Sequence, residues 1–299
     1  MTTTDTRIRA LTGDPEQQTV SLVRRYRAAP ADVWHAITTP ERIARVLGAI
    51  RGPMPAAPGD EFHVEMGPDR VRRAQLIRCD APRSLEYIWW SADDDPGTVR
   101  IRLTPVGDET ELSVTHDRLR PHWMTGYGAG WEVSLTALAE VLGEPAVPGA
   151  PPEHWELLRA RPLAITARLD APIGRVWDAW TTEAGLASWW WSHWSDVEVS
   201  ADPRVGGAYR FAAPEKGMAV SGEYLVVDPQ RRLAFTWTWS DDDGASVDEA
   251  VDVTFADDAG GTLLTIRHTG PWESDAPIES YRQGWQFVVA SLQSAIARG

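Results

Sequence analysis

The chain has 299 residues, of which 43% are hydrophobic and 24% charged, and it carries a formal net charge of −14. This length predicts two domains, and a composition close to the globular average argues against a disordered or fibrous chain. The excess of acidic residues disfavours partners held by phosphate neutralisation, so we expect neither nucleic acid nor an anionic membrane surface as a partner.

The cysteine content and the N-terminus indicate a compartment. Cys79 is the only cysteine, so the chain can form no internal disulfide and no cysteine-type zinc or iron–sulfur site. The N-terminus lacks the apolar core of a signal peptide, and no stretch approaches the roughly 18 uninterrupted apolar residues of a membrane span. We therefore expect a cytoplasmic protein, with Cys79 as an inert thiol buried in a strand.

The first half begins with a predicted strand over residues 19–27, where apolar and polar residues alternate. Pro30 suits the first turn of a helix, and a second short helix is expected from Pro40. From Gly59 the pattern changes to period-two segments rich in β-branched and aromatic residues and separated by turn residues. That pattern predicts an antiparallel meander, followed by a long helix that contains Trp131.

The second half repeats this order, with a strand over residues 163–169, a helix near Pro172 and a meander from Gly206. Its last element shows apolar residues at spacings of three and four, which is one face of a long closing helix. The residues on that face are Ile278, Tyr281, Trp285, Val288, Leu292 and Ile296.

Shared motifs show that the two halves are repeats. Residues 29–39 and 171–182 both read Ala-Pro, a short gap, then Val-Trp-x-Ala-x-Thr-Thr, and each half ends with Tyr-x-x-Gly-Trp. We therefore expect one domain over residues 1–144 and another over residues 161–299. Residues 145–160 begin with several Pro and Gly residues, so we expect them to form an extended, fairly stiff linker.

A strand, two short helices, a meander and a long C-terminal helix describe the helix-grip fold, an α+β fold with a curved antiparallel sheet around the helix. With the motifs above, residues 206–211 (Gly-Gly-Ala-Tyr-Arg-Phe) and Asp228-Pro229, the sequence resembles the bacterial homologues of the heat-shock ATPase activator. These belong to the START-like (SRPBCC) superfamily, together with the birch-pollen allergen and polyketide cyclases. The resemblance covers nearly the whole chain and implies two tandem helix-grip domains, each with an internal cavity.

Tryptophan is the outstanding feature of the composition, with 16 residues. We expect Trp34, Trp131, Trp177 and Trp285 on the buried faces of helices. Residues 189–191 are three consecutive tryptophans, and no regular element can point all three the same way. At least one of them is expected to face solvent, the neighbouring domain or a ligand.

An apolar ligand site is expected mainly in the second domain. Trp237 and Trp239 share one face of a strand, Trp189 or Trp190 is expected at the mouth, and Tyr281 and Trp285 come from the long helix. The complete set of candidate ligand-binding residues is Phe62, Tyr87, Trp89, His116, Tyr127, Trp131, Trp189, Trp190, Phe211, Phe235, Trp237, Trp239, His268, Tyr281 and Trp285.

The titratable candidates are His116 and His268, which occupy the same repeat position at the end of a strand. Either a structural hydrogen bond or a role as a cavity-facing acid or base fits that position. No carboxylate or nucleophile stands at a spacing that completes a triad, and metal-binding spacings are absent. We therefore assign no catalytic residue, metal or cofactor, and interpret residues 93–95 and 241–243, each Asp-Asp-Asp, as solvated turns.

Three functions follow from these observations. The leading hypothesis is non-catalytic binding or sequestration of an apolar, aromatic or polyketide-type small molecule. Because relatives in antibiotic producers include proteins that sequester an enediyne, the resemblance also implies antibiotic self-resistance or natural-product biosynthesis. The alternatives are a polyketide cyclase-like enzyme that uses His116, His268, Tyr127 and Tyr281 as acid/base groups, and a co-chaperone-like protein-interaction module. The sequence leaves the oligomeric state open.

Overall fold

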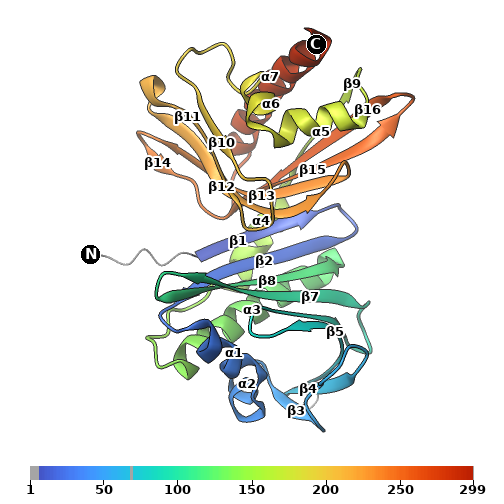
Figure 1. Cartoon of the computed structure of the whole chain (residues 1–299), viewed down its shortest axis with the longest axis vertical. Helices are drawn as coiled ribbons and strands as arrows, with labels where there is room; N and C mark the ends of the chain where they lie inside the picture. The colour runs from blue at the N-terminus through green and yellow to red at the C-terminus, as the bar shows by residue number, and fades with distance from the viewer. Residues whose placement is uncertain (1–6, 68–69, 299) are drawn as a thin grey trace. The chain divides into compact units, whose positions relative to one another are not determined.

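The computed structural model describes residues 7–67 and 70–298 (Figure 1). The chain forms two compact units, one made of residues 1–9 and 14–156 and the other of residues 10–13 and 157–299. The chain forms two eight-stranded antiparallel sheets, and each is combined with one long helix. The protein therefore consists of two tandem helix-grip domains of the α+β class. The predicted fold class is confirmed.

The first domain has its strands in the order β1-β2-β8-β7-β6-β5-β4-β3. Its long helix α3 packs against one face of the curved sheet (Figure 1). Its elements are β1 (Arg7–Gly13), β2 (Gln18–Tyr26), α1 (Pro30–Thr38), α2 (Pro40–Val46), β3 (Ala49–Arg51), β4 (Glu61–Gly67), β5 (Arg70–Asp80), β6 (Ser84–Trp90), β7 (Gly97–Val106), β8 (Glu109–Leu119) and α3 (Pro121–Val141).

Proline sets the helix starts of this domain, since α1, α2 and α3 each begin with a proline, whose fixed φ suits the first helical turn. On α1 the fully buried side chains are Val33, Ala36 and Ile37, whereas Trp34 is only half-buried. Trp34 is therefore not fully buried as expected, because its side chain lines the apolar cavity of this domain.

The segment expected as a linker is only partly extended. Residues 145–151 carry no helix or strand, but Pro152–Ala160 forms helix α4. Trp155 on this helix is fully buried, and a Cβ placed on Gly128 of α3 would lie 2.3 Å from its ring. The absence of a side chain at Gly128 therefore lets the indole pack directly against the α3 backbone. Pattern reading missed this helix because the prolines before it dominate the local signal.

The second domain has the strand order β10-β11-β12-β13-β15-β16-β9, with β14 paired to β13. Its elements are β9 (Leu163–Leu169), α5 (Ile173–Thr181), α6 (Glu183–Ala187), β10 (Glu198–Ala201), β11 (Ala208–Ala213), a 3₁₀ turn (Pro214–Lys216), β12 (Met218–Asp228), β13 (Arg232–Asp241), β14 (Gly244–Ala245), β15 (Glu249–Asp258), β16 (Gly261–Thr269) and α7 (Ala276–Arg298).

Helix α7 buries the face that its apolar spacing predicts. Trp285, Val288, Leu292 and Ile296 are all buried against the sheet, together with Val289. The ring of Trp285 lies 5.2 Å from that of Trp237 on β13, measured between centroids, so the closing helix and the sheet share one aromatic core.

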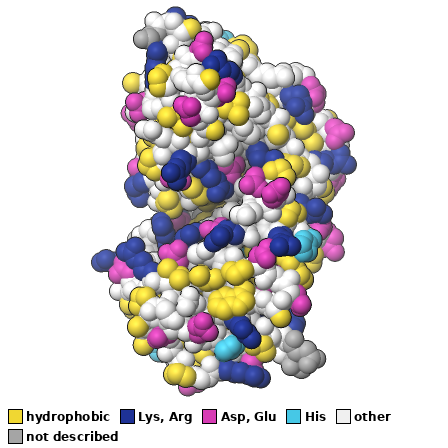
Figure 2. All heavy atoms as spheres, turned by 90° about the vertical axis from the view of Figure 1, so that its right-hand side faces the viewer, with side chains coloured by type: hydrophobic (Ala, Val, Ile, Leu, Met, Phe, Trp, Pro, Cys, Tyr) yellow, Lys and Arg dark blue, Asp and Glu magenta, His cyan; other side chains and the backbone are white. Residues whose placement is uncertain are grey.

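Charged side chains of both signs are interspersed over the face shown in Figure 2, without one extended basic region there. Within residues 7–67 and 70–298, no helix has the length and apolar character needed to cross a membrane.

Candidate functional site

The main candidate site is a cavity of about 370 Å³ in the second domain. Five tryptophans surround it, one of them on α7, and the remaining lining also comes from α7. The complete lining is Trp190, Trp191, Trp237, Trp239, Pro277, Ser280, Tyr281, Gly284, Trp285 and Val288.

Local periodicity places most of these side chains. Trp237 and Trp239 stand two residues apart on β13, so both rings lie on the same face of the strand. The α7 residues of the lining lie at positions 277, 280, 281, 284, 285 and 288, so they recur every three or four positions and form one stripe along the helix. Gly284 interrupts that stripe, and a Cβ at this position would meet no atom within 4 Å. The missing side chain therefore keeps this side of the cavity open.

The three consecutive tryptophans follow the end of α6, where the chain turns and Trp191 adopts a positive φ of 48°. All three are buried, and Trp190 and Trp191 line the cavity. Trp189 instead donates from Nε1 to the carbonyl of Ala179 at 2.9 Å and packs at a tilted angle against Trp180 within the core, with the ring centroids 4.9 Å apart. Of the two alternatives expected at the mouth, Trp189 or Trp190, only Trp190 lines the cavity, whereas Trp189 belongs to the core.

A buried polar cluster lies behind the cavity. The Tyr281 hydroxyl donates to Oε2 of Glu249 at 2.6 Å, and Nε1 of Trp272 donates to Oε1 of Glu249 at 2.8 Å. His268, which is fully buried, accepts at Nδ1 from Nε1 of Trp285 at 3.2 Å, and its Nε2 lies 3.7 Å from Oε2 of Glu249. Strand register brings these groups together, since Glu249 pairs with Trp237 and His268 with Val251.

The charge state of this cluster follows from burial and hydrogen bonding. Burial lowers the pKa of His268, and the Glu249 charge offsets this only in part, so the imidazole is neutral. Burial raises the pKa of Glu249, but the nearby His268 and the hydrogen bonds from Tyr281 and Trp272 outweigh this effect, so the pKa is lowered and the carboxylate stays ionised. Burial, followed by the Glu249 charge, raises the pKa of Tyr281 and keeps the phenol protonated.

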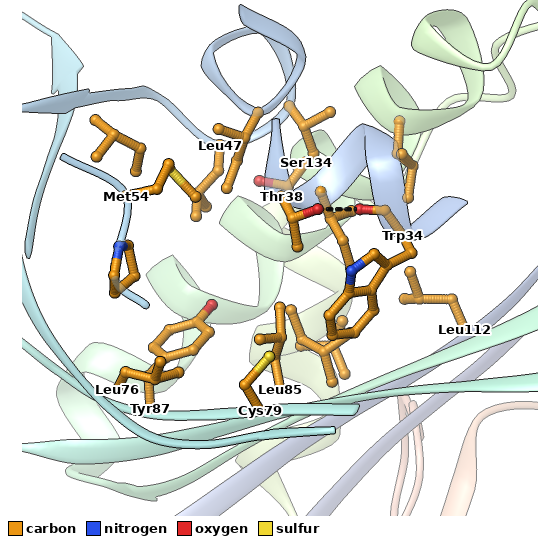
Figure 3. A pocket seen from close by; sticks show the side chains of 18 of the residues that line it. Trp34, Thr38, Leu47, Met54, Leu76, Cys79, Leu85, Tyr87, Leu112 and Ser134 are labelled. Carbon is orange, nitrogen blue, oxygen red and sulfur yellow. Dashed lines mark hydrogen bonds between the residues drawn. The ribbon is translucent and has the colours of Figure 1, made fainter. Parts of the chain in front are cut away.

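The first domain contains a second apolar cavity of about 230 Å³, enclosed by α1, α2, α3 and the sheet (Figure 3). Trp34, Phe62, Tyr87 and Trp131 contribute its aromatic surface, and aliphatic side chains make up most of the rest. Besides Tyr87, Figure 3 labels two hydroxyl side chains, Thr38 and Ser134. The Thr38 hydroxyl already donates a hydrogen bond to the carbonyl of Trp34 at 2.7 Å. This cavity therefore offers few polar anchors.

Cys79 is exposed and lines the first-domain cavity, contrary to the expectation of a buried thiol (Figure 3). The pairing of β5 with β6 shifts between Leu76 and Arg78, and this bulge adds a residue to the strand. As a result Cys79 shares the cavity-lining side with Leu76, an alternation that simple period-two counting from the sequence does not give.

A smaller cavity of about 140 Å³ in the first domain corresponds to the main site of the second, and Trp89, Tyr127 and Trp131 line it. Tyr127 donates a hydrogen bond to Asp94, and Nη1 of Arg72 lies 3.5 Å from Oδ2 of the same carboxylate. Asp94 is therefore not in a solvated turn, as its sequence context suggests: only 4% of its side chain is exposed because Tyr127, Arg72 and the Ser91 amide surround it.

The remaining predicted residues lie outside the cavities. Phe211 and Phe235 line only a void of about 10 Å³ and belong to the core. His116 and His268 line none of the cavities and hold structural hydrogen bonds with Trp131 and Trp285. Sequence reasoning missed Trp191, Glu249 and Trp272, and also Pro277, Gly284 and Val288, which the helical spacing from Tyr281 could have identified.

The described residues contain no group of three or more His, Cys, Asp or Glu side chains suited to a metal ion. A cluster of titratable side chains is nevertheless present, formed by Glu249, His268 and Tyr281, and the sequence spacing did not reveal it. His268 is fully buried and lines none of the cavities, so Tyr281 is the member of this cluster that contributes to the cavity wall.

Comparison with solved structures gives several distant likenesses. CalU16 from Micromonospora echinospora is 27% identical, covering 46% of this chain and 85% of its own, with a TM-score of 0.40. DynU16, from the dynemicin biosynthetic locus, is 18% identical, covering 95% of this chain and 98% of its own, with a TM-score of 0.40. MLL2253 from Mesorhizobium loti is 20% identical, covering 46% and 98%, with a TM-score of 0.40.

A comparison with curated proteins gives no match. The family described as "Activator of Hsp90 ATPase homolog 1-like protein" matches residues 27–143 and 170–297, one segment in each half. These segments cover most of the chain and reproduce the repeat seen in its motifs. The chain therefore belongs to the Activator of Hsp90 ATPase homolog 1-like family, with two tandem copies of its domain.

Proposed function

We propose that this protein binds an apolar small molecule with an aromatic body, without catalysis, in the second-domain cavity. The observation that carries the proposal is the enclosure of about 370 Å³ by five indoles and the Tyr281 ring. The volume lies at the lower end of the roughly 300–1,000 Å³ typical of ligand pockets. Flat π-systems match such walls because offset stacking adds about 1 kcal/mol per ring to the burial of apolar area.

The expected affinity is micromolar. Burying about 300 Å² of apolar ligand surface contributes roughly 7 kcal/mol at 25 cal/mol/Å². Stacking contributes a few kcal/mol more, and the loss of translational and rotational freedom on association offsets at least that stacking contribution. The remaining free energy of roughly 7 kcal/mol or slightly less corresponds to a micromolar dissociation constant. A rigid polycyclic guest loses the least conformational freedom on binding, which favours polyketide-type natural products over flexible chains.

The physiological form of this proposal is sequestration of such a natural product, with enediyne self-resistance as its most specialised case. A guest held between indoles is separated from solvent and from other macromolecules. The apolar first-domain cavity, with Cys79 and few polar groups, offers a smaller site for an apolar guest.

Cyclase-type catalysis is the weaker candidate. The groups that would move protons are His116 and His268, yet both are fully buried and line no cavity. Tyr281 does reach the cavity, but its raised pKa and its hydrogen bond to Glu249 make it a poor acid toward a bound guest.

The test is a titration of the full chain with a planar aromatic probe, 9-methylanthracene, followed by Trp fluorescence. Saturable quenching is expected, and Trp239→Ala should weaken the affinity by about 5- to 100-fold, since it removes one stacking wall. Trp34→Ala, in the first-domain cavity, is the matched control and should leave the main transition unchanged. If the folded Trp239→Ala protein binds with full affinity, the second-domain cavity is not the site.

A further inference from the structure

We infer that the second-domain cavity selects guests that carry a positive charge on their aromatic or apolar body. The inference rests on the proposed function and specifies its ligand class. Three observations in the two domains lead to it: a buried carboxylate without a cationic partner, an enclosure of electron-rich ring faces, and an arginine that supplies the missing charge in the first domain only.

The buried carboxylate is Glu249, the first residue of β15, whose residue surface is 4% exposed. It accepts hydrogen bonds from Tyr281 and Trp272, both neutral donors. Among the described residues, no arginine or lysine pairs with it, and His268, whose Nε2 lies 3.7 Å from Oε2, is neutral. A buried carboxylate that lacks a counter-charge costs several kcal/mol, so the folded domain retains an unbalanced negative charge beside its cavity.

The cavity walls favour a cation for a second reason. The faces of indole rings attract cations through their quadrupole, and Trp is the best residue for this interaction. Tyr281 stands between Glu249 and the cavity, and its hydroxyl donates to the carboxylate at 2.6 Å. A phenol that donates to a carboxylate gains electron density in its ring, so the ring itself transmits the charge of Glu249 toward a guest.

The first domain shows the same arrangement with its cation built in. Tyr127 donates to a carboxylate as Tyr281 does, but here the carboxylate is Asp94, and it is paired with Arg72. The guanidinium carbon of Arg72 also lies 5.4 Å from the centroid of the Tyr127 ring. One side chain thus balances the carboxylate and covers the ring face.

Strand register identifies what replaces Arg72 in the second domain. Arg73 pairs with Trp90, so Arg72 stands opposite Ser91. Because Trp89 and Trp237 are repeat counterparts, the counterpart of Ser91 is Trp239, which pairs with Val220. The second domain therefore keeps the tyrosine and a carboxylate but has a valine in place of the arginine, and a cationic guest would take the position of that missing charge.

The test compares two probes of nearly the same shape, 10-methylacridinium, which is a cation, and 9-methylanthracene, which is neutral. Both are titrated against the full chain at about 0.15 M salt, where the Debye length of about 8 Å suppresses attraction by the distant surface charge. The cation should bind about tenfold more tightly, and Glu249→Gln should remove that preference while the affinity for the neutral probe stays within about twofold.

Two further variants keep the test decisive. The side chain of Glu279 on α7 is 59% exposed, so Glu279→Gln removes a solvated charge and should leave the preference for the cation intact. Tyr281→Phe keeps the ring but removes the hydroxyl and should reduce the preference, which supplies an answer if Glu249→Gln does not fold. Equal binding of the two probes, or equal loss of both in Glu249→Gln, overturns the inference and leaves the proposed function standing. If neither probe binds saturably, both are overturned.

Discussion

Nε1 of Trp285 donates a hydrogen bond to Nδ1 of His268 at 3.2 Å, and Trp131 makes the same bond to His116 at 3.3 Å in the other domain. Since Nδ1 accepts, the proton of each neutral imidazole resides on Nε2. This pair joins the closing helix to the strand that precedes it in both repeats. The sequence left two roles open for these histidines, and the geometry assigns the structural one.

The first prediction concerns acid stability. Burial lowers the pKa of His116 from 6.5 to about 3, so between these values the unfolded chain binds a proton that the folded chain does not. The stability contributed by the neutral histidine is complete above about pH 6.5 and is lost as the pH falls toward 3. The free energy of unfolding should fall by up to about 1.4 kcal/mol per pH unit for this group.

His116→Gln keeps an acceptor for Trp131 but cannot titrate, so its unfolding free energy should change less steeply between pH 6 and pH 4. Urea unfolding followed by circular dichroism at several pH values measures the slope. His122→Gln, on an exposed side chain, is the matched control. A variant slope identical to that of the parent protein would show that His116 titrates in the folded state.

The second prediction concerns Gly284. Its Cβ would enter open space, and glycine inside a helix costs roughly 0.5–1 kcal/mol relative to alanine. Gly284→Ala should therefore stabilise the protein by up to about that amount, as thermal unfolding can measure. Gly284→Leu should also fold, but its side chain fills the cavity and should abolish probe binding.

Gly130→Leu, at the corresponding position of α3, is the control for this pair, because a Cβ at Gly130 would likewise meet no atom within 4 Å. Its effect on binding in the second domain should be negligible. Retained probe binding in a folded Gly284→Leu protein would exclude the α7 side of the cavity as the ligand site.

The third prediction tests the packing of α4 on the first domain. A methyl group at Gly128 would collide with the Trp155 ring, 2.3 Å away, so Gly128→Ala should destabilise the protein by about 1–3 kcal/mol. Replacing the ring with a smaller side chain should relieve the collision, so Gly128→Ala should cost less in a Trp155→Leu background. A double-mutant cycle measures this coupling, and additive costs would contradict the packing.

The fourth prediction concerns Cys79. Its exposed thiol lines the first-domain cavity, so a thiol reagent such as 5,5′-dithiobis(2-nitrobenzoate) should react with one thiol per molecule of the native, folded protein. Met54→Trp, which adds bulk to the same cavity, should slow the reaction. Reaction only in denaturant would place the thiol in the core instead.

Short-range periodicity accounts for the parts of the site that the sequence predicts. Tyr281 and Trp285 share a helix face because 3.6 residues make a turn, and Trp237 and Trp239 share a strand face because side chains alternate. The repeat motifs add the order of elements, so the tandem helix-grip architecture is legible in the chain.

Contacts between residues far apart in the chain could not be predicted from the sequence. The carboxylate that Tyr281 contacts lies 32 positions earlier on β15, whereas Tyr127 uses a carboxylate 33 positions earlier in a loop, so nearly equal separations arise from different elements. Nothing local distinguishes Asp94, which is buried, from the acidic turns that remain exposed. Likewise, only the turn after α6 decides that Trp189 enters the core and Trp190 the cavity.

By itself, then, the amino-acid sequence determined the two repeats, their elements and the faces those elements bury, since these depend on periods of two and 3.6 residues. The tertiary structure decided which aromatic rings enclose empty space, which thiol is accessible and which carboxylate remains without a counter-charge. Those properties depend on strand register, on the bulge in β5 and on the turn at Trp191, where the displacement of one residue reverses the direction of a side chain.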